Sequence, residues 1–235
     1  MNYIKNLIKS LIPILVIYIL NYLVIIILSL IYTLLFNNNL DIFINNYLPY
    51  LLIPYFVLII LFIKHKYKYP NNKTNISKYY LSLSLGISLS VFLNMIIFLI
   101  IKDIPTPTTN LITSIISSAI IGPIFEEYIF RYYLLNKIKT FNNNTISILI
   151  GTTIFAIVHT SITNIIFAFI LGLFLNLIYH KYKNINLSIV LHTGANLIAI
   201  FLKEYNFLIL ILSFLNLLIY SLIFLKNKNQ ISLHL

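Results

Sequence analysis

Two adjacent glutamates and one arginine stand inside an apolar run, where charged side chains are rare. Glu126 and Glu127 lie within residues 111–135, and Arg131, the single arginine of the chain, follows one helical turn later. A carboxylate in hydrocarbon costs roughly 2.5–3.5 kcal/mol, so it usually faces a bundle interior or a water-filled cavity. Glu127 and Arg131 are spaced i, i+4 and can pair on one helix face. Glu126 is rotated by about 100° and has no cationic partner in its helix, so it is available as a general base.

Two histidines and an asparagine interrupt later apolar runs. His159 ends the run over 146–158, and His192 lies four residues before Asn196, so that both can point toward one spot. Gly194, between them, allows a neighbouring helix to approach closely. Three separate segments therefore carry polar groups suited to acid–base chemistry, which predicts a site within the bundle.

The amino-acid composition indicates the environment of these residues. The 235 residues are 60% hydrophobic and 9% charged, with a mean hydropathy of +0.96. Soluble domains carry about 25% charged residues, so a soluble globule and a disordered chain are both excluded. The absence of cysteine excludes disulfides, thiol nucleophiles and thiolate-bound zinc. The fold class predicted is all-α, a polytopic transmembrane helix bundle.

Uncharged apolar runs place about eight transmembrane helices along the chain, because about 20 residues cross the hydrocarbon. The first run is too long for the apolar core of a signal peptide, so it is expected to be retained. The boundary between the fifth and sixth runs is the least distinct. The predicted spans are 11–36, 48–63, 79–101, 111–135, 146–158, 162–179, 185–202 and 205–225.

The lysines give this segmentation an orientation. The formal net charge is +11, and thirteen of the fifteen lysines fall on one side when the spans alternate from a cytoplasmic N-terminus. An excess of lysine marks the cytoplasmic side, so the charge needs no nucleic-acid partner. We expect both termini to lie on the cytoplasmic side. The membrane is expected to be a prokaryotic plasma membrane. Glu126, His159 and His192 lie about 12–21 Å from the cytoplasmic loops at 1.5 Å per residue, so the site is expected to open toward the cytosol.

The three motifs together resemble a known family. Glu126-Glu127-x-x-x-Arg131, Phe155-x-x-x-His159 and His192-x-x-x-Asn196 are similar to the motifs of the CPBP or Abi family, which includes CAAX proteases and type II CAAX prenyl endopeptidases. The resemblance covers about residues 111–203, expected to form a catalytic core of helices 4–7. Residues 1–110 would supply helices 1–3, and residues 204–235 the last helix and a cytoplasmic tail, in one integral membrane domain.

This resemblance implies an intramembrane endopeptidase. By analogy, Glu126 and His159 would activate the attacking water, His192 and Asn196 would hold the oxyanion, and Glu127 and Arg131 would support the site. Its substrate would be a membrane-associated protein or peptide cut near its C-terminus, whether or not it carries a CAAX prenyl group. The lipid bilayer is the other expected partner.

Metal use has two readings. Glu126, His159 and His192 form a two-histidine, one-carboxylate set that could bind zinc as in a metalloendopeptidase. The chain has no His-Glu-x-x-His sequence, so a glutamate-type mechanism without a metal cofactor is favoured.

Two functions other than proteolysis use the same residues. A non-catalytic immunity or scaffold protein would keep the fold without turnover. A proton- or ion-coupled transporter would use the glutamates and histidines as a relay, although no internal repeat is evident.

Overall fold

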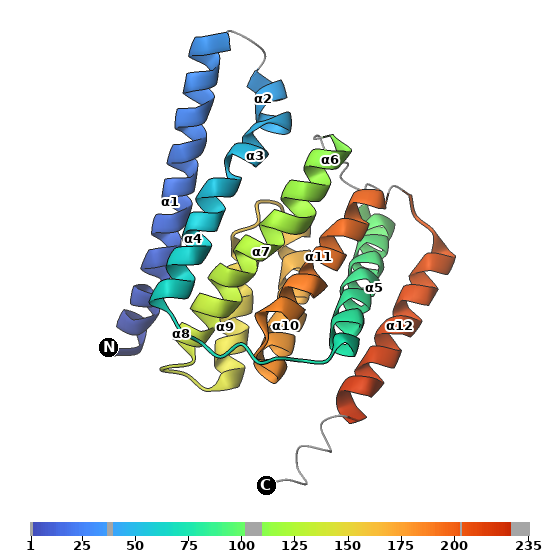
Figure 1. Cartoon of the computed structure of the whole chain (residues 1–235). Helices are drawn as coiled ribbons and strands as arrows, with labels where there is room; N and C mark the ends of the chain where they lie inside the picture. The colour runs from blue at the N-terminus through green and yellow to red at the C-terminus, as the bar shows by residue number, and fades with distance from the viewer. Residues whose placement is uncertain (1, 37–39, 102–109, 203, 227–235) are drawn as a thin grey trace.

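The computed structural model describes residues 2–36, 40–101, 110–202 and 204–226. Every regular element within these ranges is a helix (Figure 1). The elements are α1 (Asn2–Phe36), α2 (Leu40–Asn46), α3 (Leu48–Leu51), α4 (Ile53–Lys66), α5 (Ile76–Ile101), α6 (Leu111–Thr113), η1 (Ser114–Ile121), α7 (Gly122–Glu127), η2 (Tyr128–Leu135), α8 (Asn136–Ile138), α9 (Asn144–Ile157), α10 (Ile162–Tyr182), α11 (Ile185–Phe201) and α12 (Phe207–Lys226).

The helices follow the predicted spans. Within the described ranges, five are long and apolar enough to cross a membrane, namely Tyr3–Phe36, Leu48–Lys66, Ile76–Ile100, Leu111–Ile138 and Ile162–Tyr182. Three shorter apolar helices, α9, α11 and α12, lie where the fifth, seventh and eighth spans were predicted. The all-α polytopic bundle expected from the sequence is therefore confirmed, and the chain is an integral membrane protein.

The second span is more broken than its hydropathy indicates. Pro49 and Pro54 stand in the first turns of α3 and α4, where a missing backbone N–H costs least. Residues 40–46, for which no element was predicted, form the short helix α2. Its Phe43 is buried and stacks on Tyr32 of α1 with ring centroids 4.3 Å apart. A tertiary contact therefore stabilises a helix that is not predicted from its own sequence.

The helical rod formed by residues 111–138 (α6, η1, α7, η2 and α8), which carries the glutamates, has an unusual backbone. The Asn110 side chain caps its first turn by accepting a hydrogen bond from the Thr113 N–H. Two π-helical stretches, η1 and η2, flank the short α-helix α7. The Gly122 N–H bonds the Ser117 carbonyl, five residues back, and Pro123 removes one α-helical donor. Glu126 and Glu127 therefore lie at the end of an α-helical segment between two wider turns, a feature that often accompanies functional sites.

Helices α5 and α11 approach closely because each presents a glycine to the other. A Cβ on Gly86 of α5 would overlap the Leu191 carbonyl group of α11. A Cβ on Gly194 would lie 2.9 Å from the Leu83 carbonyl oxygen, which agrees with the close approach predicted at that glycine. Helix α10 packs against α9 and α11, and α12 packs against α5 (Figure 1). This arrangement sets α11 between α5 and the rod with the glutamates.

Candidate active site

The Glu127 carboxylate is the centre of a buried polar cluster. Its Oε1 accepts a hydrogen bond from Arg131 Nη1 at 2.9 Å, the pairing predicted from their spacing. The same oxygen lies 2.8 Å from His192 Nδ1 of α11. Because an ionised carboxylate only accepts hydrogen bonds, Nδ1 carries the proton in this contact. The side chains of Glu127 and Arg131 are fully buried, so the contact fixes the imidazole in both tautomer and orientation.

The Glu126 carboxylate lies on the other side of the same imidazole. Its Oε2 is 3.8 Å from His192 Nε2, and the side chain is 29% exposed. That separation is beyond a direct hydrogen bond, and Oε2 has no hydrogen-bond partner in the described structure. Glu126 is thus the more accessible of the two glutamates, and among the described residues the basic nitrogen within 4 Å of its carboxylate is His192 Nε2. The His192 imidazole stands between two carboxylates.

The Arg131 guanidinium is held by more than its ion pair. It lies 4.1 Å from the centroid of the Phe155 ring, and its Nη2 is 3.4 Å from the Gly172 carbonyl oxygen. A Cβ on Gly172 would lie 2.8 Å from Phe155 and 3.3 Å from Arg131 Nη2. In the sequence, Phe155 is only the first residue of the motif that ends at His159, and no role is predicted for Gly172. The signal for Phe155 was present, since it stands one turn before His159 in α9, but the contact with Arg131 depends on how the helices pack.

The two histidines contact the same aromatic ring. His159 packs edge-on against Phe155 with centroids 5.1 Å apart, and His192 does so at 5.8 Å. His159 Nδ1 is 3.0 Å from the Phe155 carbonyl oxygen and donates to it, which leaves Nε2 unprotonated in the neutral ring. Within the described ranges no ion pair joins His159 to either glutamate.

Asn196 faces a different neighbour from His192. Its Nδ2 donates to the Ser118 carbonyl oxygen at 2.9 Å, whereas the His192 ring is turned toward the glutamates, so the two do not share a partner despite their i, i+4 spacing. Asn196 lines a polar hollow of about 180 Å³ together with Asn94, Thr163 and Asn164. Thr163 and Asn164 lie in the first turn of α10, whereas Lys181 lies in its last turn, 17–18 residues further on, so the hollow occupies the half of the bundle remote from that lysine. The expected opening toward the cytosol stays a prediction.

The three candidate zinc ligands are not gathered into a metal site. Across the described ranges, no group of three or more histidine, cysteine, aspartate or glutamate side chains is arranged to hold a metal ion. His192 uses Nδ1 for Glu127, and His159 uses Nδ1 for a backbone carbonyl, so Nε2 is the remaining nitrogen of each ring. The choice between the glutamate mechanism and a zinc site at Glu126, His159 and His192 stays a prediction.

Known proteins of one family are similar to the part of the chain that carries this polar cluster. Residues 108–198 match the family described as Type II CAAX prenyl endopeptidase Rce1-like. The chain is also similar to two proteins of Lactococcus lactis subsp. lactis (strain IL1403). It is 38% identical to UPF0177 protein YbdJ over 86 residues, 36% of this chain and 37% of that protein, and 28% identical to UPF0177 protein YbdI over 82 residues, 34% of this chain and 44% of that protein. No solved structure matches the chain significantly.

These findings confirm the resemblance predicted from the three motifs. The bundle and the match define an integral membrane protein of helices with an Rce1-like segment at 108–198. That segment contains all six predicted site residues, from Glu126 to Asn196. The chain spans less than half of the length of either relative.

Proposed function

We propose that this protein is a membrane-embedded endopeptidase of glutamate type, with Glu126 as the general base. The observation that carries the proposal is the His192 imidazole, held by buried Glu127 at 2.8 Å and facing the more accessible Glu126 at 3.8 Å. A hydrolase needs a base beside a water and a donor aimed at the developing oxyanion. Glu126 and His192 Nε2 supply these two functions side by side, and the similarity to type II CAAX prenyl endopeptidases supports the reaction class.

The first step is attack on the scissile carbonyl. Glu126 takes a proton from water as the water oxygen bonds to the carbonyl carbon, and the carbonyl π electrons move to the oxygen. His192 donates Nδ1–H to Glu127, so its Nε2 carries a proton when the imidazole is cationic and then donates to the oxyanion. With His192 cationic, two carboxylates and two cations in the cluster sum to zero charge, which suits burial in a bilayer.

The second step is collapse of the tetrahedral intermediate. The oxyanion re-forms the carbonyl, the C–N bond breaks, and Glu126–COOH returns its proton to the leaving amine nitrogen. Arg131 and Glu127 act as positioning residues, since they hold the imidazole rather than the substrate. The unprotonated Nε2 of His159 would orient the attacking water, and the polar hollow at Asn196 would hold the amides of the substrate backbone.

The substrate class proposed is a membrane-associated protein or peptide cut near its C-terminus. The experiment compares membrane proteomes from cells that express the wild type, Glu126→Gln or Glu204→Gln. Glu204 is an exposed glutamate outside the cluster, so the control makes the same chemical change away from the site. A C-terminal fragment released by the wild type and the control, and lost in Glu126→Gln, supports the proposal.

Full cleavage by a folded Glu126→Gln variant would remove the base from the mechanism. A biological effect that persists in Glu126→Gln without any released fragment would instead favour the non-catalytic scaffold.

A further inference from the structure

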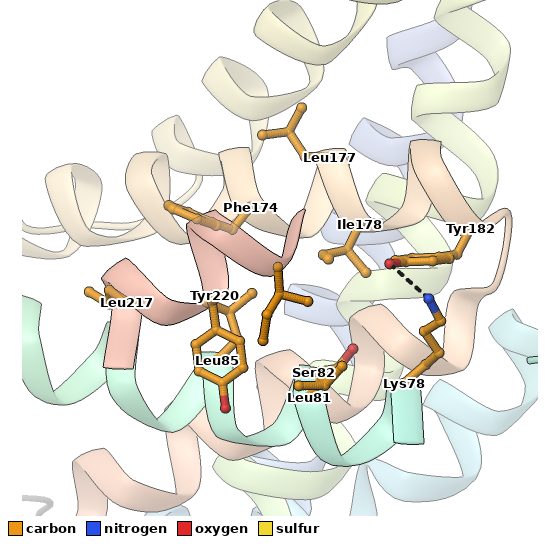
Figure 2. Close-up of a pocket in the computed structure, with 11 residues that line it drawn as sticks. Lys78, Leu81, Ser82, Leu85, Phe174, Leu177, Ile178, Tyr182, Leu217 and Tyr220 are labelled. Atoms are coloured by element: carbon orange, nitrogen blue, oxygen red, sulfur yellow. Dashed lines mark hydrogen bonds between the residues drawn. The ribbon is translucent and has the colours of Figure 1, made fainter. Parts of the chain in front are cut away.

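A second, apolar pocket lies between α5, α10 and α12. Its volume is about 300 Å³, at the lower end of the range for small-molecule sites. Figure 2 shows Lys78 and Tyr182 at one end of the pocket and Phe174 and Leu217 toward the other. Most of the wall is aliphatic or aromatic, and the lining side chains are Lys78, Leu81, Ser82, Leu85, Phe174, Leu177, Ile178, Tyr182, Leu217, Tyr220 and Ile223.

Two ammonium groups lie near the Tyr182 ring, and one of them, that of Lys78, lines the polar end of this pocket. Lys78 Nζ lies 4.7 Å from the centroid of the Tyr182 ring and donates to the Tyr182 hydroxyl at 3.4 Å, the dashed contact in Figure 2. Lys181 Nζ lies 5.5 Å from the centroid of the same ring. Among the ion pairs of the described residues, none includes Lys78. The contact with the Tyr182 ring thus holds a positive charge at one end of an apolar cavity.

The surrounding sequence adds positive charge and no negative charge. Residues 64–78, 136–145 and 180–184 carry nine lysines and no aspartate or glutamate. Basic side chains lie close together at Lys139, which is outside the membrane spans. Its Nζ is 2.9 Å from His180 Nδ1. Burial, and then the charge of Lys183, lower the pKa of Lys139 to about 7. No side chain of these three segments therefore supplies counter-charge to the lysines.

The pocket is separate from the candidate active site. None of Glu126, Glu127, Arg131, His159 or His192 lines it. Its walls come from the first half of α5, the second half of α10 and the second half of α12. The function inferred for it therefore stands or falls independently of the proposed peptidase.

We propose that this pocket binds an anionic phospholipid of the surrounding bilayer. An acyl chain lies along Phe174, Leu177 and Leu217, and the phosphate is bound by the Lys78 ammonium group and the Tyr182 hydroxyl. Lysine near a membrane surface attracts anionic lipid at about a fivefold gain in affinity per charge. A zwitterionic lipid could fill the apolar wall but would leave the lysine-rich end without net counter-charge.

The absence of tryptophan from the chain permits a local optical test. The Tyr220→Trp variant places a single indole in the pocket with little change in volume. The matched Tyr80→Trp variant places it on α5 at a side chain that is 68% exposed and outside the pocket lining. The full-length variants are titrated in detergent micelles with phosphatidylglycerol or phosphatidylcholine whose acyl chains are brominated, because bromine quenches indole fluorescence at contact.

We expect phosphatidylglycerol to quench the indole of Tyr220→Trp at a lower mole fraction than phosphatidylcholine does. The two lipids should quench the indole of Tyr80→Trp at the same mole fraction. Adding Lys78→Gln should raise the half-quenching mole fraction of phosphatidylglycerol about fivefold. The control Lys73→Gln removes an exposed lysine of the same segment and should leave it unchanged.

Equal quenching of Tyr220→Trp by both lipids would overturn the proposal, because the pocket would then accept any acyl chain. An equal effect of Lys78→Gln and Lys73→Gln would also overturn it, since the charge would act diffusely. Competition by soluble glycerol phosphate as effective as that by phosphatidylglycerol would assign the site to a free phosphate instead. Circular dichroism and a thermal midpoint in phosphatidylcholine micelles check that each variant is folded.

Discussion

The strongest quantitative expectation concerns the buried pair at the centre of the cluster. Replacing Glu127 with glutamine keeps the shape of the side chain but removes its charge. Two charge-assisted hydrogen bonds, from Arg131 at 2.9 Å and from His192 at 2.8 Å, would weaken, and the guanidinium would stay buried without a counter-charge. Removing one partner of a buried pair costs about 3–5 kcal/mol. We expect Glu127→Gln to destabilise the protein by about that amount.

A double-mutant cycle separates the pair from the rest of the site. Arg131→Met removes the cation and keeps an apolar side chain against Phe155. We expect Arg131→Met alone to be similarly destabilising, and the double variant to cost about 2–3 kcal/mol less than the sum of the single costs, because neither charge is then left alone.

The free energies of unfolding would be measured by reversible denaturation in mixed micelles of dodecyl maltoside and sodium dodecyl sulfate. A cycle with Glu204→Gln and Arg131→Met serves as the additive control, since Glu204 is exposed and outside the cluster. Additivity within about 0.5 kcal/mol in the Glu127–Arg131 cycle would refute the reasoning, because the two groups would then not share their burial cost.

Further expectations concern packing, titration and metal use. Gly86→Ala should lower the thermal midpoint strongly, because its Cβ would overlap the Leu191 carbonyl group, whereas Gly151→Ala, with no contact closer than 3.5 Å, should be tolerated; equal midpoints would contradict the helix contact. Because the pKa of Lys139 is lowered to about 7 in the folded protein, the unfolded chain binds more protons between about pH 7 and the ordinary lysine value, so stability should rise with pH over that window. Replacing Lys139 with methionine should flatten this rise in a pH series of thermal midpoints, and an unchanged slope would contradict it. Peptidase activity in proteoliposomes should survive exhaustive chelation, and loss with rescue by added zinc would replace the glutamate mechanism with a metal-dependent one.

The sequence determines the spans well because long apolar runs leave few alternatives for a chain in lipid. The run predicted at 162–179 is α10, Ile162–Tyr182, and the run at 185–202 is α11, Ile185–Phe201. The prediction is weaker where tertiary contacts decide, as at α2, which is stabilised by the stacking of Phe43 on Tyr32. It also gives no indication of the π-helical turns around α7, because these depend on which carbonyl each N–H finally reaches.

The candidate site shows the same division between local and long-range information. The Glu127–Arg131 pair follows from a spacing within one helix, and it is present in the structure. The bond from His192 to Glu127 joins residues 65 positions apart and depends on how α11 is rotated against α7, which a spacing rule does not contain. For the same reason, His192 and Asn196 share a helix face yet bind different partners.

The wide turns on either side of α7 have a consequence for how this segment tolerates insertion and deletion. A π-helical turn contains one residue more than the α-helical turn it replaces. Loss of one residue from η1 can therefore be absorbed by tightening the turn, without shortening the rod or breaking it. Because the residue is taken from the wide turn, the helix that follows keeps its direction, and the two neighbouring glutamates still face their original partners. A single-codon deletion in η1 would thus leave the direction of both glutamates intact, whereas one at the start of α7, where no extra residue can be lost, would turn the residues that follow by about 100°.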